Sequence, residues 1–204
     1  MEDLRDFGFE HPKAQRLADL AGIMRDLELS VEACELFLRS PSVGSRDAIL
    51  SSKAIGAFAI LTYFRTFSTG VRSGIARQAV DRLAPHLQSV HTKLKAVRDQ
   101  YLAHSVNQQE VNSVGVVLQS DNSLHAIGTV HSRPAAFSCK DIRDLRELAQ
   151  ALMVHMDEEY GLEFNALWDF LVSLPVEGRL KLFQAKPGSS VNLDWRAKQR
   201  KFRA

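Results

Sequence analysis

Arg98, Asp99 and His104 are the residues whose types and spacing could do chemistry together, in the segment Arg-Asp-Gln-Tyr-Leu-Ala-His. A histidine titrates near neutral pH, so it can take a proton from an RNA 2′-hydroxyl or give one to a leaving 5′-oxygen without a metal. An arginine supplies a permanent planar cation that holds a phosphate and stabilises charge developing on it. A carboxylate does not bind phosphate directly, so Asp99 would orient Arg98 or His104. This set of side chains suits work on a phosphodiester.

The spacing of Arg98 and His104 puts a condition on that chemistry. Six residues at about 100° each leave the two side chains roughly 120° apart on an ideal helix. Either the helix loosens near its end, or the two groups meet across a dimer. His104 also continues an apolar stripe, and a dimer face and a protein core look the same in a sequence. The stripe consists of Val90, Leu94, Val97 and Tyr101.

Helical periodicity predicts the elements that must position these residues. We expect a first amphipathic helix over 11–27 and a second over 31–38, with Ser30 as its N-cap. The segment 47–67 is apolar nearly all round, which predicts a central core helix. A short helix over 75–83 should precede the helix that begins at Pro85 and carries the candidate residues to about His104.

The periodicity changes after His104, where two β-rich runs flank the turn-forming sequence Gln-Ser-Asp-Asn-Ser. We expect a small β-hairpin at about 113–131, inserted after the helix that carries the motif. Helical periodicity returns at Cys139 and runs to about Leu171. The predicted fold is therefore mainly α, a helical bundle with one hairpin: a domain over 1–175 and a basic C-terminal arm over 176–204.

The segment around Arg98 resembles the signature of the HEPN superfamily, which is Arg, a polar residue, a few more positions and then His, late in a core helix. Arg98 and His104 match the signature Arg and His, Asp99 matches the polar follower, and Ala103 and Ser105 match the residues that often flank the His.

A second likeness lies upstream, where Leu-Thr-Tyr-Phe-Arg-Thr-Phe-Ser at 61–68 resembles the preceding core helix in an abortive-infection branch of that superfamily. The β-rich sequence after the His is also similar to that branch, and the likeness runs from about 54 to 130. The resemblance implies a bundle of the HEPN type that cleaves RNA without a metal or cofactor, with sites assembled in a homodimer. It implies a toxin or antiviral defence role, in which an antitoxin would be the protein partner.

Four further residues are candidates for lining the same site. Arg65 stands on an otherwise apolar helix, where a charge must find a partner or reach solvent. Tyr63 could hydrogen-bond within the site, and Tyr101 and Ser105 adjoin the motif. Several of the candidate residues also have a structural interpretation: His104 as a buried or capping histidine, Arg98 and Asp99 as ordinary helix-surface residues, and Tyr63 as core packing. A non-catalytic RNA-binding or dimerisation module of the same fold, or a purely structural helical protein, therefore stays open.

Composition narrows the class of protein. The chain has 204 residues, 45% hydrophobic and 25% charged, with a net charge of +2, which is typical of a folded globular domain. Cys34 and Cys139 form no disulfide framework or Cys-x-x-Cys pair, so we expect reduced thiols and a cytosolic protein. The longest apolar run, around 54–63, is shorter than the roughly 20 residues that cross a bilayer. The histidines of the helix that begins at Pro85 do not suggest a metal site. His86 and His91 are five residues apart, a poor spacing for a metal pair on one helix face, so we expect no metal there.

The end of the predicted arm interleaves aromatic and basic residues, with five cations and no acid from 196 to 203. This pattern suits contacts with the RNA backbone and stacking on bases, although a solvated terminus is the alternative. The residues are Trp195, Arg196, Lys198, Arg200, Lys201, Phe202 and Arg203.

Overall fold

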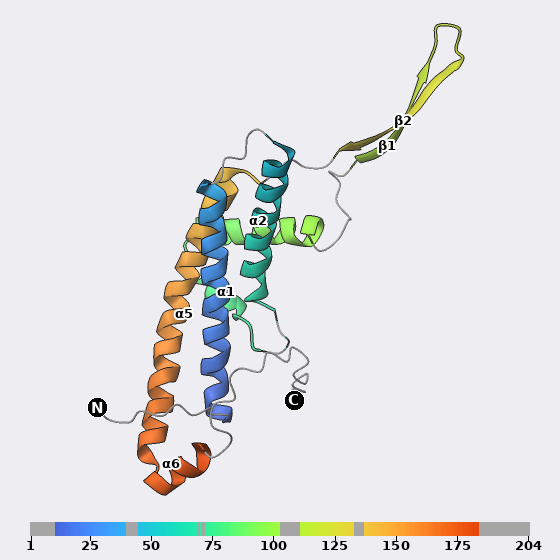
Figure 1. Cartoon of the computed structure of the whole chain (residues 1–204). Helices are drawn as coiled ribbons and strands as arrows, with labels where there is room; N and C mark the ends of the chain where they lie inside the picture. The colour runs from blue at the N-terminus through green and yellow to red at the C-terminus, as the bar shows by residue number, and fades with distance from the viewer. Residues whose placement is uncertain are drawn as a thin grey trace.

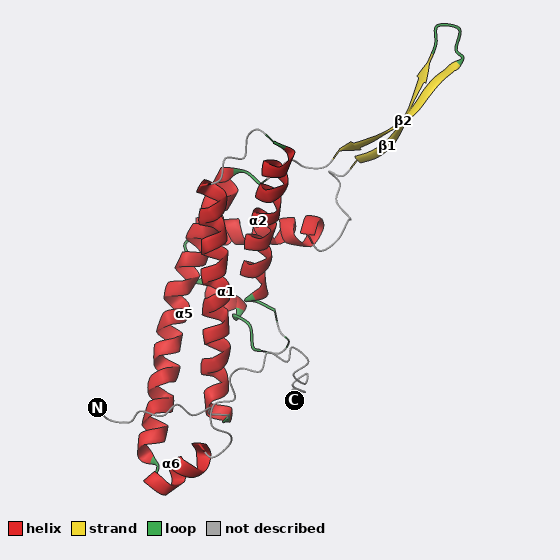
Figure 2. Ribbon diagram, in the orientation of Figure 1, coloured by secondary structure: helices red, strands yellow, loops and turns green. Residues whose placement is uncertain are grey.

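The computed structural model shows a mainly helical protein with one two-stranded antiparallel hairpin (Figure 2), as the sequence predicts at that level of detail. The structure describes residues 11–39, 45–68, 70, 72–102, 111–132 and 137–183.

Two long antiparallel helices, α1 (Pro12–Arg39) and α5 (Cys139–Ser173), form the spine of the molecule (Figure 1). At 1.5 Å per residue, α5 is about 52 Å long. Its start is capped by Ser138, whose side chain accepts a hydrogen bond from the Asp141 amide at 3.1 Å. Apolar side chains at helical spacing on both helices are fully buried and make the core: Leu20, Ile23 and Leu27 from α1, with Ile142, Leu145, Leu148 and Leu152 from α5.

The prediction of two helices over 11–27 and 31–38 is wrong, because α1 runs through Ser30 without a break. Ser30 is fully buried, and its hydroxyl donates to the Ala59 carbonyl at 2.9 Å. A hydrogen bond to another helix satisfies this side chain, so it does not cap a helix of its own.

Helix α2 (Arg46–Arg65) packs against α1 and confirms the predicted helix, but the expectation that it is buried on most sides is wrong, because only one side of it faces the core. Ser45 caps it by accepting the Ala48 amide at 3.1 Å. Ile60, Tyr63 and Phe64 lie in the core, whereas several apolar residues on the opposite side are exposed. By length and composition, α2 is apolar enough to cross a bilayer, but core helices pass the same test, so this is weak evidence.

The short helix α3 (Arg77–Asp81) leads to α4 (Pro85–Val97), which crosses the long helices at a steep angle (Figure 1). Leu94 is buried, and Val90 and Val97 pack on the core half-buried, so these three positions of the predicted stripe face the protein, and Leu87 is buried beside them. The last residues of the element, Arg98–Leu102, form a single π-helical turn, η1.

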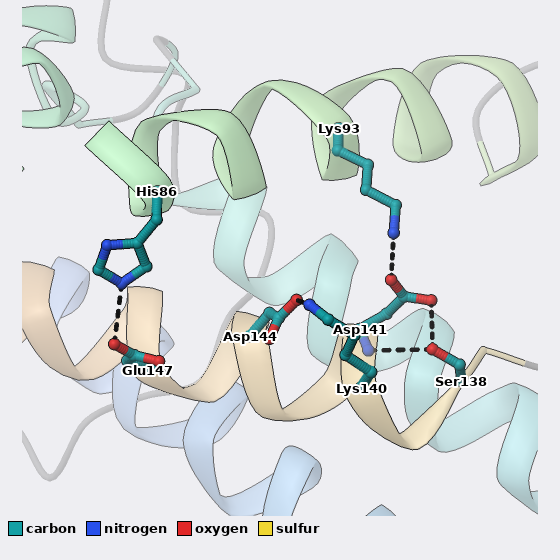
Figure 3. Close-up of polar contacts among 7 residues, drawn as sticks. All are labelled: His86, Lys93, Ser138, Lys140, Asp141, Asp144 and Glu147. Atoms are coloured by element: carbon teal, nitrogen blue, oxygen red, sulfur yellow. Dashed lines mark hydrogen bonds and ion pairs between the residues drawn. The ribbon is translucent and has the colours of Figure 1, made fainter. Parts of the chain in front are cut away.

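Side chains of α4 and α5 clamp the two helices together (Figure 3). The Lys93 ammonium is paired with the Asp141 carboxylate, and His86 Nε2 lies 3.0 Å from Glu147 Oε1. Burial alone would raise the pKa of Asp141, but hydrogen bonds from Lys93 and Ser138 outweigh it and lower that pKa below its usual value. These contacts join α4, which leads into Arg98, to the start of α5.

The predicted hairpin is confirmed as β1 (Val111–Leu118) and β2 (Leu124–Ser132), with Val116 opposite Ile127. Asn122 adopts φ 64° in the connecting turn, a left-handed conformation that asparagine tolerates. The hairpin projects away from the helices (Figure 1). At the other end of the molecule, the first residues of the predicted C-terminal arm form a helix, α6 (Val176–Phe183).

Candidate functional site

Arg98 lies where α4 widens into the π-turn, with about a third of its side chain exposed. Its guanidinium carbon is 5.4 Å from the centre of the Phe64 ring, within the range of a cation–π contact. Its Nε atom is buried and makes no hydrogen bond within the described part of the chain, although Asp99 Oδ1 lies 3.1 Å away. An aromatic face and a neighbouring carboxylate therefore hold this cation while part of it reaches solvent.

Asp99 stands between two cations. Its Oδ2 atom accepts a hydrogen bond from the Lys95 ammonium at 2.6 Å, one helical turn earlier, and its Oδ1 atom faces Arg98. Asp99 therefore contacts two cations, and it lies where it can fix the direction of the Arg98 guanidinium.

The backbone at Arg98–Leu102 is a π-helical turn. Such turns are rare, occur mostly as single turns within α-helices, and are frequent at functional sites. The helix that carries the motif therefore does loosen at its end. The backbone of Tyr101 is part of this turn, while His104 and Ser105 lie outside the described residues.

A tyrosine–histidine pair lies beside Arg98 on the α2 side. The Tyr63 hydroxyl is 2.8 Å from His91 Nδ1, and Tyr63 is fully buried. Burial raises the pKa of Tyr63 far above its usual value, so this hydroxyl keeps its proton. Burial, and then the charges of Lys95 and Arg77, lower the pKa of His91, whose Nδ1 shares one hydrogen bond with the Tyr63 hydroxyl.

Phe64 links the two groups, since its ring centre is 5.3 Å from that of His91 and also packs on Arg98. In the sequence, His91 stands out only through its spacing from His86, which is poor for a metal pair and does not reveal the contact with Tyr63. A usable signal was present: His91 and Arg98 are seven residues apart, about two helical turns, which places them on one face of α4.

Arg65 lies in a different set of contacts. Its Nε and Nη2 atoms donate to Asp26 at 3.0 and 2.7 Å, and Arg72 pairs with the same carboxylate. Asp26 is almost completely buried in α1. The structure therefore brings Tyr63, Arg98 and Asp99 to the meeting point of α2 and α4, and it directs Arg65 toward α1.

A second buried acid extends this network along α1. Asp19 Oδ2 accepts hydrogen bonds from the Ser73 amide and hydroxyl at 3.0 and 2.9 Å, so it ties the segment after α2 to α1. Gly22 lies between the two acids, and a Cβ there would come 2.7 Å from Arg72 Nη1. The network is a structural tie that fixes the end of α2, from which Tyr63 and Phe64 reach the site.

The described residues include no group of three or more His, Cys, Asp or Glu side chains arranged to hold a metal ion. The basic and aromatic residues predicted to contact RNA, from Trp195 to Arg203, lie outside the described residues.

No family model matches the chain, and no curated protein or solved structure matches it either. The resemblance to the HEPN superfamily therefore rests on the residues quoted from the sequence.

Proposed function

We propose that this protein is a metal-independent endoribonuclease of the HEPN type, acting as a homodimer in a toxin or antiviral defence role. The observation that supports the proposal is the placement of Arg98. Its guanidinium is partly exposed, held by Asp99 and Phe64, and set on a π-turn six residues before His104. Support on two sides keeps the guanidinium in one direction, which binding of a phosphate requires.

In this proposal Arg98 binds the scissile phosphate and stabilises its developing charge, and Asp99 orients Arg98. His104 takes the proton of the 2′-hydroxyl as that oxygen attacks the phosphorus, and the bond from phosphorus to the 5′-oxygen breaks. The imidazolium then gives the proton to the leaving 5′-oxygen. The products are a 2′,3′-cyclic phosphate and a 5′-hydroxyl, so atoms and protons balance without a cofactor.

The test compares the purified wild-type chain with His104→Ala and Arg98→Ala on total or transfer RNA in EDTA. We expect each variant to lose about 10²–10⁴-fold in cleavage rate. Arg25→Ala is a matched control, because it also removes a guanidinium, but one that is exposed and whose ion pairs, with Glu28 and Glu32, lie within α1. Equal cleavage by all four proteins would remove the catalytic roles of Arg98 and His104.

The second candidate is a non-catalytic RNA-binding or dimerisation module of the same fold. The engagement of Arg98 by Asp99 and Phe64 also favours this reading, because these contacts would hold the arginine for a structural reason. It predicts intact RNA and, at most, binding that weakens steeply with salt. Expression in a host separates the two, since a nuclease toxin arrests growth and a binding module does not.

The proposal places the protein in the cytosol, where free thiols such as Cys34 and Cys139 persist. An antitoxin would be expected beside a toxin. A neighbouring gene for such a partner would support the defence role.

A further inference from the structure

The β-hairpin is the part of the molecule least supported by its surroundings. Every described residue from Ser113 to Thr129 is exposed, and the hairpin points away from the helices (Figure 1). An isolated two-stranded hairpin is at best marginally stable in water, because it needs more strands or a helix packed on one face. The described part of the chain supplies neither, so we expect a covering surface from outside the described residues.

One face of the hairpin is suited to such packing. Val114 lies opposite Thr129, and Val116 lies opposite Ile127, so these four β-branched residues share one face, which we call the arm face. Val114, Val116 and Ile127 are 67%, 57% and 65% exposed. The other face is flatter, because it includes the facing pair Gly115 and Gly128.

The charge of the hairpin restricts what can cover it. Asp121 is its only Asp, Glu, Lys or Arg, and it lies in the turn. A nucleic acid would meet no cation to neutralise its phosphates. The edges also lack lysine and proline, the residues that proteins use to protect exposed strands from pairing. The expected occupant is therefore an uncharged, apolar protein surface.

The same chain carries a surface of that kind on α2. Leu50, Phe58 and Leu61 are 66%, 50% and 45% exposed, and Ala54 is exposed between them. Their spacing places these four residues within about 80° of one another, so they form one helix stripe. The stripe is about 17 Å long, and the apolar part of the arm from Val114 to Leu118 is about 14 Å long.

We propose that the hairpin is a dimerisation arm, whose arm face packs on the helix stripe of a second copy of this chain, with the exchange made in both directions. Each copy offers the arm and its complement, so the interface is self-complementary and closes after two subunits. Because each hairpin packs on the helix stripe of the other copy, the dimer buries twice the surface of a single contact, which brings it toward the roughly 1,200–2,000 Å² of a stable interface. This inference concerns assembly and does not depend on the nuclease proposal.

Disulfide cross-linking tests the proposal on the full-length chain. Cys139→Ser removes the exposed thiol, and the buried Cys34 stays. In that background one protein carries Phe58→Cys, and a second, larger by a tag, carries Val116→Cys. After mixing and mild oxidation, we expect a disulfide-linked species with one chain of each size.

Three results would overturn the proposal. Cross-links between two Val116→Cys chains only would mean that the arms pair with each other, and an intrachain disulfide in a chain that carries both cysteines would place the arm on its own α2. The third result is the absence of any cross-link together with a monomeric mass in analytical ultracentrifugation.

A matched pair of substitutions gives an independent measurement. Ile127→Glu puts a charge on the arm face, whereas Ala126→Glu puts the same charge on the opposite face of the same strand. We expect Ile127→Glu to raise the dimer dissociation constant about tenfold or more and Ala126→Glu to leave it nearly unchanged. Equal effects of the two substitutions, or no effect of Ile127→Glu, would contradict packing through the arm face.

Discussion

Replacing Asp26 with asparagine tests how the fold holds α1 against the end of α2. The side chain of Asp26 is 2% exposed and accepts two hydrogen bonds from Arg65 and one from Arg72. Asparagine keeps the shape, removes the charge, and points at least one amide N–H toward an arginine. Breaking a buried ion pair costs about 3–5 kcal/mol, because the remaining charge is left without its partner.

The exposure of the two arginines sets the magnitude for this protein. The side chain of Arg65 is 67% exposed, so it regains water and adds little to the cost, whereas that of Arg72 is 21% exposed and is left without its partner. We therefore expect a loss of about 2–4 kcal/mol in the free energy of unfolding. For a chain of this size, that lowers the melting temperature by roughly 4–16 °C.

Thermal and urea unfolding, followed by circular dichroism, measure this loss. Glu32→Gln is the control, because it removes an ion pair with Arg25 on the same helix in which both side chains are more than half exposed. We expect no measurable change in its melting temperature. An Asp26→Asn variant as stable as the control would refute the reasoning that the buried carboxylate holds α1 to α2.

Three further predictions concern other parts of the fold. Burial, Lys95 and Arg77 lower the pKa of His91 below its ordinary value of 6.5, so the unfolded chain binds the proton more readily than the folded chain. The stability that depends on neutral His91 should be fully present above pH 6.5 and be lost as the pH falls below it, and His91→Gln should flatten that part of the stability–pH curve. Gly56→Ala should cost about 1–3 kcal/mol in the free energy of urea unfolding, because its Cβ would clash with the Phe137 ring, whereas Gly161→Ala, which meets open space, should gain about 0.5–1 kcal/mol; equal shifts would contradict this packing. A disulfide reagent should titrate one thiol per native chain, because Cys139 is exposed while burial raises the pKa of the Cys34 thiol to about 12; two fast thiols would contradict that burial.

Local patterns predict the elements of this fold well. The hairpin follows from β-rich runs around an Asp/Asn/Ser turn, and the turn does place Asn122 at positive φ. After Cys139, apolar residues recur at helical spacing in successive turns, and this repeated pattern predicts α5. Strong and repeated signals of this kind need no knowledge of the rest of the molecule.

The errors and omissions lie where a partner distant in sequence decides the outcome. Ser30 has the local character of an N-cap, but its hydroxyl bonds a carbonyl 29 residues away. Asp19 and Asp26 would be assigned to a solvent-facing side of α1 by type alone, yet Ser73, Arg65 and Arg72 allow both to be buried.

The contacts of the candidate site are likewise of two kinds, those between neighbours in sequence and those that depend on how the helices pack. The contact between Arg98 and Asp99 joins adjacent residues, so the sequence alone suggests it. The aromatic support from Phe64 and the pairing of Tyr63 with His91 depend on how α4 crosses α2, and no local pattern encodes that angle. Tertiary geometry therefore adds residues to the site that motif spacing leaves out.

The chemical nature of the RNA ends tests the central claim most directly. The measurement is mass spectrometry of a short oligoribonucleotide after incubation with the purified protein in EDTA, beside the same strand with 2′-deoxy sugars at the cleaved linkages. The account predicts 2′,3′-cyclic phosphate and 5′-hydroxyl ends from the ribose strand, no cleavage at the deoxy linkages, and intact RNA with Arg98→Ala or His104→Ala. Cleavage of the deoxy strand, or the same ends in the same yield from both variants, would contradict it.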